Sequence, residues 1–188
     1  MRIVGGSHKG RPLSAPSGRA TRPTADRTRE AIFNKLNHAS WARGVEGARV
    51  IDLFAGSGAL GLEAMSRGAA FCLFVETDAG ARGAIRDNVE TLQLWGNTRL
   101  HRRDATKLGA KPAGLGAPFD LVFLDPPYKA GLGPPALQAL VAGGWVGDNA
   151  IAVFEMGADE RVETPGWTLI DEADHGAARV VYLTRATQ

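Results

Sequence analysis

The sequence contains one cysteine, Cys72, and four scattered histidines among its 188 residues. A single cysteine cannot form an internal disulfide, and the histidines lack metal-ligand spacing, so we expect no disulfide and no zinc or iron–sulfur site. The longest stretch without a charged residue, 130–147, contains two prolines and five glycines. We therefore expect no membrane helix there, since one needs about 20 mostly apolar residues. The first residues lack the apolar stretch of a secretory signal, so we expect a cytoplasmic protein.

The composition, with 44% hydrophobic and 22% charged residues, fits one compact domain with little room for a second. Charge is divided unevenly along the chain. Residues 1–49 contain ten Lys/Arg and three acidic residues, a net +7, whereas residues 50–188 have a net −5. A basic segment on an acidic body suits a protein that contacts a phosphate backbone with one surface and a cationic small molecule with another. The alternative is a solvated basic tail.

Residues 1–48 are expected to form a basic extension ahead of the main domain. Residues 2–24 are rich in Gly, Pro, Ser and Arg, which predicts a small hairpin or an extended arm. A helix is predicted over residues 25–37, where apolar residues follow helical spacing and Thr24 or Asp26 can cap the first turn. The basic residues of this helix that we expect to face solvent are Arg27, Arg29 and Lys35.

Residues 49–188 alternate short apolar runs with longer helical patterns. The apolar runs predict strands buried on both faces at 50–54, 71–75, 121–124 and 151–154, with a weaker strand at 98–102. Helices are predicted between them at 60–67 and 79–94. This alternation predicts a doubly wound, mostly parallel α/β sheet. The last two runs, 167–170 and 179–184, leave no room for a crossover helix, so they predict an antiparallel pair.

A glycine-rich turn follows the first predicted strand. Residues 52–61 read Asp-Leu-Phe-Ala-Gly-Ser-Gly-Ala-Leu-Gly, and their glycines fit the GxGxxG pattern, with Glu76 lying 20 residues beyond Gly56. Taken alone, this pattern is typical of a nicotinamide dinucleotide site. Asp52, however, precedes the glycines where it would meet a cationic amine, and the chain has no room for a separate substrate domain. These features favour a nucleoside that carries an amino acid; a glycine turn without a ligand is the third alternative.

Further acidic residues follow the next two predicted strands. Glu76 ends the strand at 71–75, where a carboxylate can accept hydrogen bonds from both hydroxyls of a ribose. Thr77 or Asp78 can cap the following helix. Asp104 follows the weaker strand and is similarly located to meet the amino edge of an adenine.

The segment Asp125-Pro126-Pro127-Tyr128 directly follows a buried strand. Two prolines remove two backbone donors and fix φ, so that the aspartate carboxylate and a neighbouring carbonyl face one pocket. Such a pair can accept both hydrogens of an exocyclic amino group, while Tyr128 offers a ring on which a base can stack. A proline turn with an incidental aspartate is the alternative.

Together, residues 52–58, Glu76, Asp104 and residues 125–128 resemble the class I S-adenosylmethionine-dependent methyltransferases that modify exocyclic amino groups. Within that class, four short pieces resemble the bacterial 16S rRNA guanine-N2 methyltransferase family: residues 5–6, 9–11, 22–30 and 33–34. Asp-Pro-Pro-Tyr alone does not select the base, because DNA adenine methyltransferases share it. The N-terminal segment and the small size favour guanine.

The resemblance implies a Rossmann-like sheet of seven strands, mostly parallel with an antiparallel last strand, over residues 49–188. It implies methyl transfer from S-adenosylmethionine to the exocyclic N2 of a guanine in 16S rRNA, guanine 966 in the family. The expected partner is 16S rRNA within a small-subunit assembly particle, and we expect a monomer without metal or membrane. Other amino-methyltransferases acting on adenine N6, a nicotinamide-dependent reductase and a non-catalytic RNA-binding protein are the alternatives.

The resemblance also assigns site residues by their positions in the shared motifs. The catalytic residues would be Asp125, Pro126 and Tyr128. The cofactor-binding residues would be Asp52, Phe54, Gly56, Ser57, Gly58, Glu76, Thr77, Asp104 and Ala105. The RNA-binding residues would be Lys9, Arg11, Arg22 and Arg27.

Overall fold

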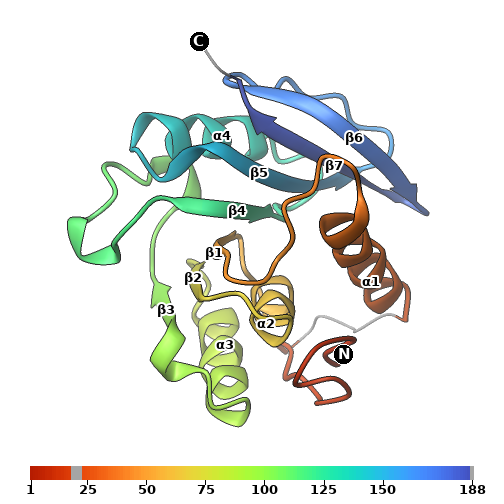
Figure 1. Cartoon of the computed structure of the whole chain (residues 1–188), viewed down its shortest axis with the longest axis vertical. Coiled ribbons are helices and arrows are strands. Elements are labelled where there is room, and N and C mark those ends of the chain that lie inside the picture. Colours follow the sequence, from red (N-terminus) through yellow and green to blue (C-terminus); the bar gives the residue numbers. More distant parts are fainter. Residues whose placement is uncertain (18–22, 187–188) are drawn as a thin grey trace.

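The computed structural model describes residues 1–17 and 23–186. Within these residues, seven strands form one sheet in the order β3-β2-β1-β4-β5-β7-β6 (Figure 1). The strands are β1 (Arg49–Leu53), β2 (Phe71–Val75), β3 (Thr98–His101), β4 (Phe119–Leu124), β5 (Val146–Gly157), β6 (Trp167–His175) and β7 (Ala178–Arg185). Strands β1 to β5 pair in parallel, whereas β7 is antiparallel to both of its neighbours. The predicted mostly parallel sheet with an antiparallel last strand is confirmed.

In the described part of the chain, four α-helices flank this sheet: α1 (Pro23–His38), α2 (Ala59–Ser66), α3 (Ala79–Thr91) and α4 (Gly133–Ala142). The sequence patterns do not predict α4, because its Gly-Pro-Pro start is typical of a loop. Proline is nevertheless tolerated in the first turn of a helix, where its missing N–H would have no partner. Helix α3 ends earlier than predicted, because Gln93 takes the left-handed conformation (φ 57°) that closes many helices. No helix of the described ranges is long and apolar enough to cross a membrane.

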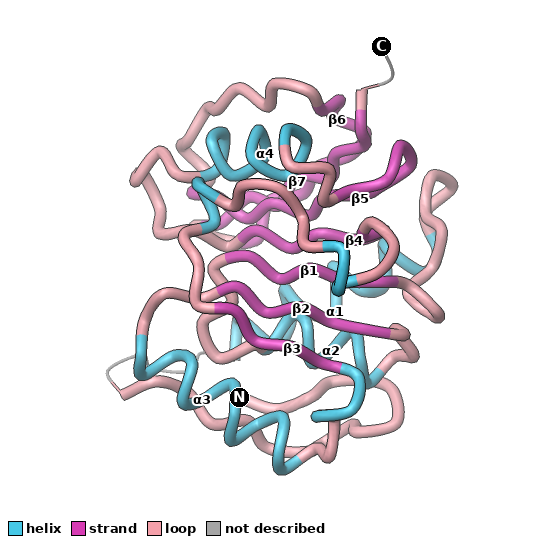
Figure 2. Tube along the Cα trace, turned by 90° about the vertical axis from the view of Figure 1, so that its left-hand side faces the viewer, coloured by secondary structure: helices cyan, strands magenta, loops and turns pink. Residues whose placement is uncertain are grey.

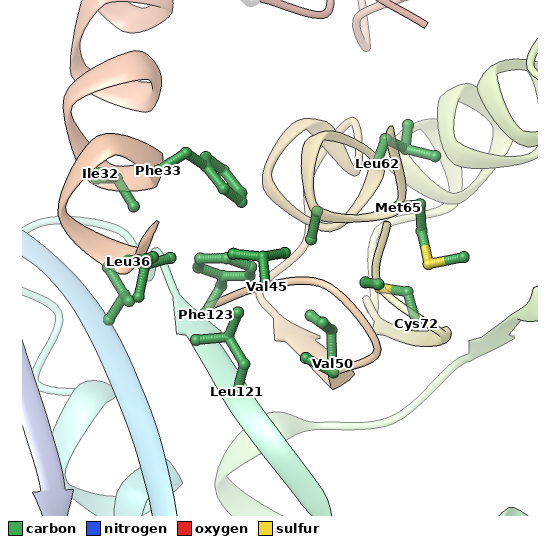
Figure 3. Close-up of a cluster of buried hydrophobic side chains, with 14 of the residues drawn as sticks. Ile32, Phe33, Leu36, Val45, Val50, Leu62, Met65, Cys72, Leu121 and Phe123 are labelled. Carbon is green, nitrogen blue, oxygen red and sulfur yellow. The ribbon is translucent and has the colours of Figure 1, made fainter. Parts of the chain in front are cut away.

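The helices cover both faces of the sheet, whose stacked strands are seen in Figure 2. Side chains alternate along each buried strand, so that Val50 packs on one face and Ile51 on the other. The first face carries α1, α2 and α3, and its core includes Phe33, Leu62 and Phe123 (Figure 3). The second face carries α4. Burial on both faces explains why these strands read as continuous apolar runs.

The N-terminal arm, residues 1–17, begins with a short hairpin. Arg2 and Pro12 form an antiparallel bridge. The Ile3 N–H donates to the Arg11 carbonyl (3.0 Å), and the Gly10 N–H donates to the Ile3 carbonyl (2.8 Å). The buried Ile3 side chain joins the core under α1 and α2, so the hairpin is anchored by apolar packing as well.

The arm is also hydrogen-bonded to α2 and α3. The Ser7 N–H donates to the Ser66 carbonyl (2.8 Å), and the His8 N–H donates to Ser66 Oγ (2.9 Å). The Asn88 side chain pairs with the backbone of Ser14 in both directions, at 2.7 and 3.0 Å. Residues 1–17 are therefore a packed part of the fold, which excludes the alternative of a solvated tail for them.

The completely buried carboxylate of Glu63 joins the arm to α1 and α2. Its Oε2 accepts the Val4 N–H (2.9 Å) and lies 3.4 Å from Arg29 Nε, while its Oε1 lies 2.9 Å from Arg67 Nε. The prediction that Arg29 faces solvent is wrong: its side chain is 4% exposed. Asp26 does not cap α1, since it lies within the first turn and pairs with Arg29 at 2.8 Å. The periodicity of α1 alone could not reveal an acidic partner on another helix.

Replacing Glu63 with Gln should destabilise the protein strongly. The substitution keeps the shape but leaves the Arg29 guanidinium buried without its full counter-charge. Removing one partner of a buried ion pair costs about 3 to 5 kcal/mol, which urea denaturation monitored by circular dichroism would detect. Glu90→Gln, at an exposed position of α3, is the matched control and should change stability by less than about 0.5 kcal/mol. Equal midpoints for both variants would contradict this role of Glu63.

Candidate functional site

A cleft of about 620 Å³ opens at the carboxyl ends of β1, β4 and β5. Open α/β sheets bind their ligands at this edge, where the chain leaves the strands in loops. The walls come from six parts of the chain: the arm, α1, the turn after β1, the end of β4, the end of β5, and the turn between β6 and β7. A volume of roughly 300 to 1,000 Å³ is typical of sites for small molecules. The cleft is therefore large enough for a nucleoside-sized ligand.

The turn after β1 is fixed by left-handed backbone and by Glu76. Phe54, Gly56 and Gly58 have φ angles of 55°, 60° and 80°. Phe54 is the unusual member, because a left-handed conformation strains a residue with a side chain and such strain gathers at functional sites. The Gly56 N–H donates to Glu76 Oε2 (2.8 Å), while Oε1 of the same carboxylate accepts the Asp78 N–H (2.9 Å). Glu76 thus ties the glycine turn to the end of β2.

Asp52 presents a buried carboxylate to the cleft. Its side chain is 1% exposed, and Oδ2 accepts the Gly61 N–H at 2.9 Å. Burial raises the pKa of Asp52 well above its usual range, and the charges of Asp125 and Glu76 raise it further, against the opposing effect of the Gly61 bond. A cationic ligand group beside Asp52 would stabilise its ionised form. The buried carboxylate of Asp52 therefore fits a ligand that carries an ammonium group.

Gly61 allows α2 to approach Asp52 this closely. A Cβ at this position would lie 2.6 Å from Cys72 Sγ and 2.5 Å from the ring of Phe74, both closer than real Cβ atoms come to other heavy atoms. The third glycine of the motif therefore serves close packing of helix on strand.

The Asp125-to-Tyr128 segment forms the opposite wall. Asp125 is exposed to the cleft at the end of β4, whereas Pro126 is buried behind it. Tyr128 is 45% exposed, and its hydroxyl donates to Glu155 Oε1 at 2.7 Å. Partial burial and the neighbouring Glu155 carboxylate raise the pKa of Tyr128, so its hydroxyl stays protonated at neutral pH. The turn is held from behind by Glu160, whose Oε1 accepts the Lys129 N–H (3.0 Å).

The structure brings most of the predicted site residues together. Those that line the cleft are Asp52, Phe54, Gly56, Ser57, Asp125 and Tyr128. Gly58 is the N-cap of α2. Glu76 does not line the cleft, but it accepts a hydrogen bond from Gly56, which does. Thr77 and Asp104 lie exposed beyond β2 and β3, outside the lining residues, and Ala105 is buried in the core on the α4 face. Two bonds from Thr106 to Asp104 Oδ1, at 2.7 and 2.9 Å, lower the pKa of Asp104.

The predicted RNA-binding residues lie on the arm and α1. Lys9, Arg11 and Arg27 are exposed. Arg11 also has a structural contact, since its Nη2 donates to the Thr91 carbonyl at the end of α3 (3.1 Å). Arg22 lies outside the described residues.

Several lining residues are missed by sequence reasoning. They are Met1, Ala15, Pro16, Thr28, Arg29, Ile32, Glu155 and residues 175–178. Most of them carry no local signal, because the arm, α1 and the β6–β7 turn reach the cleft only through tertiary packing. Glu155 is different, since it directly follows the apolar run 151–154, just as Glu76 and Asp125 follow theirs. That shared position could have identified it.

Comparison with known proteins places the chain in a family. Residues 1–184 match the family described as "Conserved hypothetical protein 95". The chain is 37% identical over 190 residues to "Ribosomal RNA small subunit methyltransferase D" of Escherichia coli (strain K12), covering 100% of this chain and 91% of that protein. It is 33% identical over 177 residues to the protein of the same name in Haemophilus influenzae, covering 94% and 89%. Among solved structures, "Putative methyltransferase yhhF from Escherichia coli" aligns with a TM-score of 0.80 and 34% identity, covering 100% and 99%.

Replacing Glu76 with Ala should weaken binding of S-adenosylmethionine, the cofactor implied by the resemblance. The substitution removes an anionic acceptor and releases the Gly56 N–H from its anchor. Loss of a hydrogen bond to a charged group costs about 1.5 to 3 kcal/mol, a rise in Kd of roughly 10- to 150-fold. Isothermal titration calorimetry measures this change, with the exposed Asp87→Ala of α3 as the control. An unchanged Kd in a folded variant would remove Glu76 from the site.

Proposed function

The chain belongs to the family described as Conserved hypothetical protein 95, and from this premise we propose that it methylates the exocyclic N2 of a guanine in 16S rRNA, using S-adenosylmethionine. The observation that carries the proposal is the meeting of two parts in one cleft. The glycine turn with Asp52 forms one wall, and Asp125 and Tyr128 form the other. Residues suited to bind the amino group of a base thus face a site suited to a cationic nucleoside. The names of the relatives support rRNA as the substrate.

The cofactor side of the cleft would hold S-adenosylmethionine through backbone and carboxylates. Gly56 brings backbone without a side chain to the cleft wall, and Asp52 supplies a negative charge for the ammonium group. Glu76 holds the turn and lies at the strand end suited to ribose hydroxyls. When bound, S-adenosylmethionine supplies a methyl group on a positively charged sulfur. The acidic lining complements that charge.

The substrate side would orient the amino group of the base. Guanine N2 is a weak nucleophile, because its lone pair is delocalised into the ring, so positioning must supply much of the rate. The Asp125 carboxylate and the Pro126 carbonyl would accept the two amino hydrogens and direct the nitrogen into the cleft. Tyr128 would stack on the extruded base through its half-exposed ring. Asp125 or water would then take the proton released.

The Asp125→Ala variant tests this role directly. We expect at least an approximately 100-fold loss in kcat/KM, comparable to removing a positioned acid–base group, with little change in the affinity for S-adenosylmethionine. The assay supplies labelled S-adenosylmethionine to small ribosomal subunits and to naked 16S rRNA that both lack the modification. Mass spectrometry of the digested RNA identifies the methylated nucleoside. Asp148→Ala, at an exposed position near the start of β5, is the control and should retain activity.

The outcomes of this assay separate the alternatives. N2-methylguanosine from the wild type supports the proposal, and the better of the two substrates reports whether an assembled particle is required. N6-methyladenosine would overturn the choice of base. Absence of methyl transfer from the wild type to either substrate, or full activity of a folded Asp125→Ala variant, would overturn the assignment of the site.

The basic extension should supply phosphate contacts. Lys9 on the hairpin and Arg27 on α1 are exposed, which suits contact with an RNA backbone. Replacing both with Ala should weaken RNA binding and reduce the slope of log K against log salt by about 0.7 to 0.9 for each phosphate that is no longer neutralised. We leave Arg11 intact because of its bond to Thr91.

The measurement is RNA affinity at several salt concentrations for the wild type and the double variant. Lys107→Ala is the control, because Lys107 is exposed and ends the short η2 turn (Ala105–Lys107) that packs beside α4, on the opposite face of the sheet from the arm. Cofactor affinity should be unchanged in all three proteins. A slope that stays at the wild-type value would show that Lys9 and Arg27 do not bind phosphates.

A further inference from the structure

Glu155 occupies the position on β5 that Asp125 occupies after β4. The two strands pair in parallel with Leu124 opposite Phe154, so the next residues, Asp125 just after β4 and Glu155 still within β5, lie at the same level of neighbouring segments. Paired strands lie about 4.8 Å apart. Both side chains line the large cleft. A second carboxylate thus stands beside the one that would hold the amino group of the substrate.

Tyr128 connects Glu155 to the same group of residues. Its hydroxyl donates to Glu155 Oε1 at 2.7 Å, and its ring also lines the cleft. An ionised carboxylate has about four lone-pair sites on its two oxygens. One bond from Tyr128 therefore leaves Glu155 with capacity to accept hydrogen bonds from a ligand.

Two adjacent carboxylates suit the Watson–Crick edge of guanine better than that of adenine. Guanine presents two neighbouring donors on this edge, the N1–H and the N2 amino group. Adenine presents an amino group beside N1, which is a lone-pair acceptor. A carboxylate facing adenine N1 would bring two acceptors together and leave a buried polar group unpaired, which is how sites built for hydrogen bonds reject a wrong ligand.

We propose that Glu155 selects guanine, by accepting the N1–H of the target base while Asp125 holds its N2 amino group. This inference rests on the proposed function and adds the residue that determines the base. It also explains how a motif compatible with either amino base can be restricted to one: the specificity comes from β5, outside the Asp-Pro-Pro-Tyr segment.

The test compares guanine with 2-aminopurine at the target position of 16S rRNA assembled by ligation into small subunits. The analogue keeps the N2 amino group, replaces the N1–H with an acceptor and also lacks O6, so the change in preference between wild type and variant is the quantity that reports on Glu155. We expect the wild type to prefer guanine by at least 100-fold in kcat/KM. In Glu155→Gln, the neutral amide is a weaker acceptor for the N1–H of guanine, so activity on guanine should fall at least tenfold. The amide N–H can donate to N1 of 2-aminopurine, so the preference for guanine should shrink at least tenfold.

Two further variants separate base reading from simpler roles. Tyr128→Phe removes the hydroxyl bonded to Glu155 but keeps both the ring and the carboxylate; it should lower activity on both bases by a similar factor. Glu163→Gln, at an exposed site in the loop before β6, is the matched control and should match the wild type. Melting temperature and affinity for S-adenosylmethionine report whether each variant has an intact cleft.

The results distinguish failure of this inference from failure of the proposed function. Equal losses on guanine and 2-aminopurine in Glu155→Gln would overturn the selection of guanine by Glu155. The selection of guanine by Glu155 would also be overturned if Tyr128→Phe changed the base preference as much as Glu155→Gln does. Glu155 would then act only by holding the Tyr128 hydroxyl. Wild-type protein that methylates no guanine substrate would overturn the proposed function itself. A preference that collapses in Glu155→Gln alone supports the inference.

Discussion

The buried carboxylate of Glu63 is the contact on which the shape of the cleft depends. It accepts the Val4 N–H from the arm and lies beside Arg29 of α1 and Arg67 at the end of α2. These partners are 59, 34 and 4 residues away along the chain, so one side chain fixes three separate segments. The arm and α1 in turn supply one wall of the cleft, including Met1, which lines it together with Arg29. Loss of this contact would weaken the attachment of the arm and α1 to α2, and with it the enclosure around the strand ends.

At the floor of the cleft, in contrast to the paired carboxylate of Glu63, acidic residues gather. Four adjacent strands of the sheet, β2, β1, β4 and β5, end in or near Glu76, Asp52, Asp125 and Glu155. Like charges oppose one another: burial is the main cause of the raised pKa of Asp52, and the charges of Asp125 and Glu76 raise it further. The arrangement costs free energy in the protein alone, and a cationic ligand would relieve that cost. Such a cluster is typical of a functional site, where charge is arranged for a ligand at the expense of stability.

The sequence predicted the elements whose signals are local. Strands buried on both faces appear as apolar runs, and the turn after β1 is visible in Gly56 and Gly58, whose left-handed φ angles glycine adopts without strain. Features that depend on contacts between distant residues were not predicted. Arg29 looked like a solvent-facing residue of an amphipathic helix, because nothing in α1 reports the buried Glu63. Glu155 is not predicted although its strand is, because its one signal, the position after an apolar run, is accompanied by neither a glycine turn nor a proline motif.

Under the proposed function, the uneven distribution of charge assigns affinity and base selection to two different surfaces. Residues 1–49 have a net charge of +7, but some of their basic side chains make contacts within the fold. Arg29 pairs with Glu63, and Lys35 pairs with Asp171 at 2.8 Å. Arg11 donates a hydrogen bond to the end of α3. Under the proposed function, the remaining exposed cations attract RNA phosphates, and such contacts carry no sequence information. Under the same proposal, the acidic cleft would repel the backbone but would accept hydrogen bonds from a base turned out of its stack. Affinity would therefore arise on the basic surface, whereas the choice of nucleotide would be made by the carboxylates at the ends of β4 and β5.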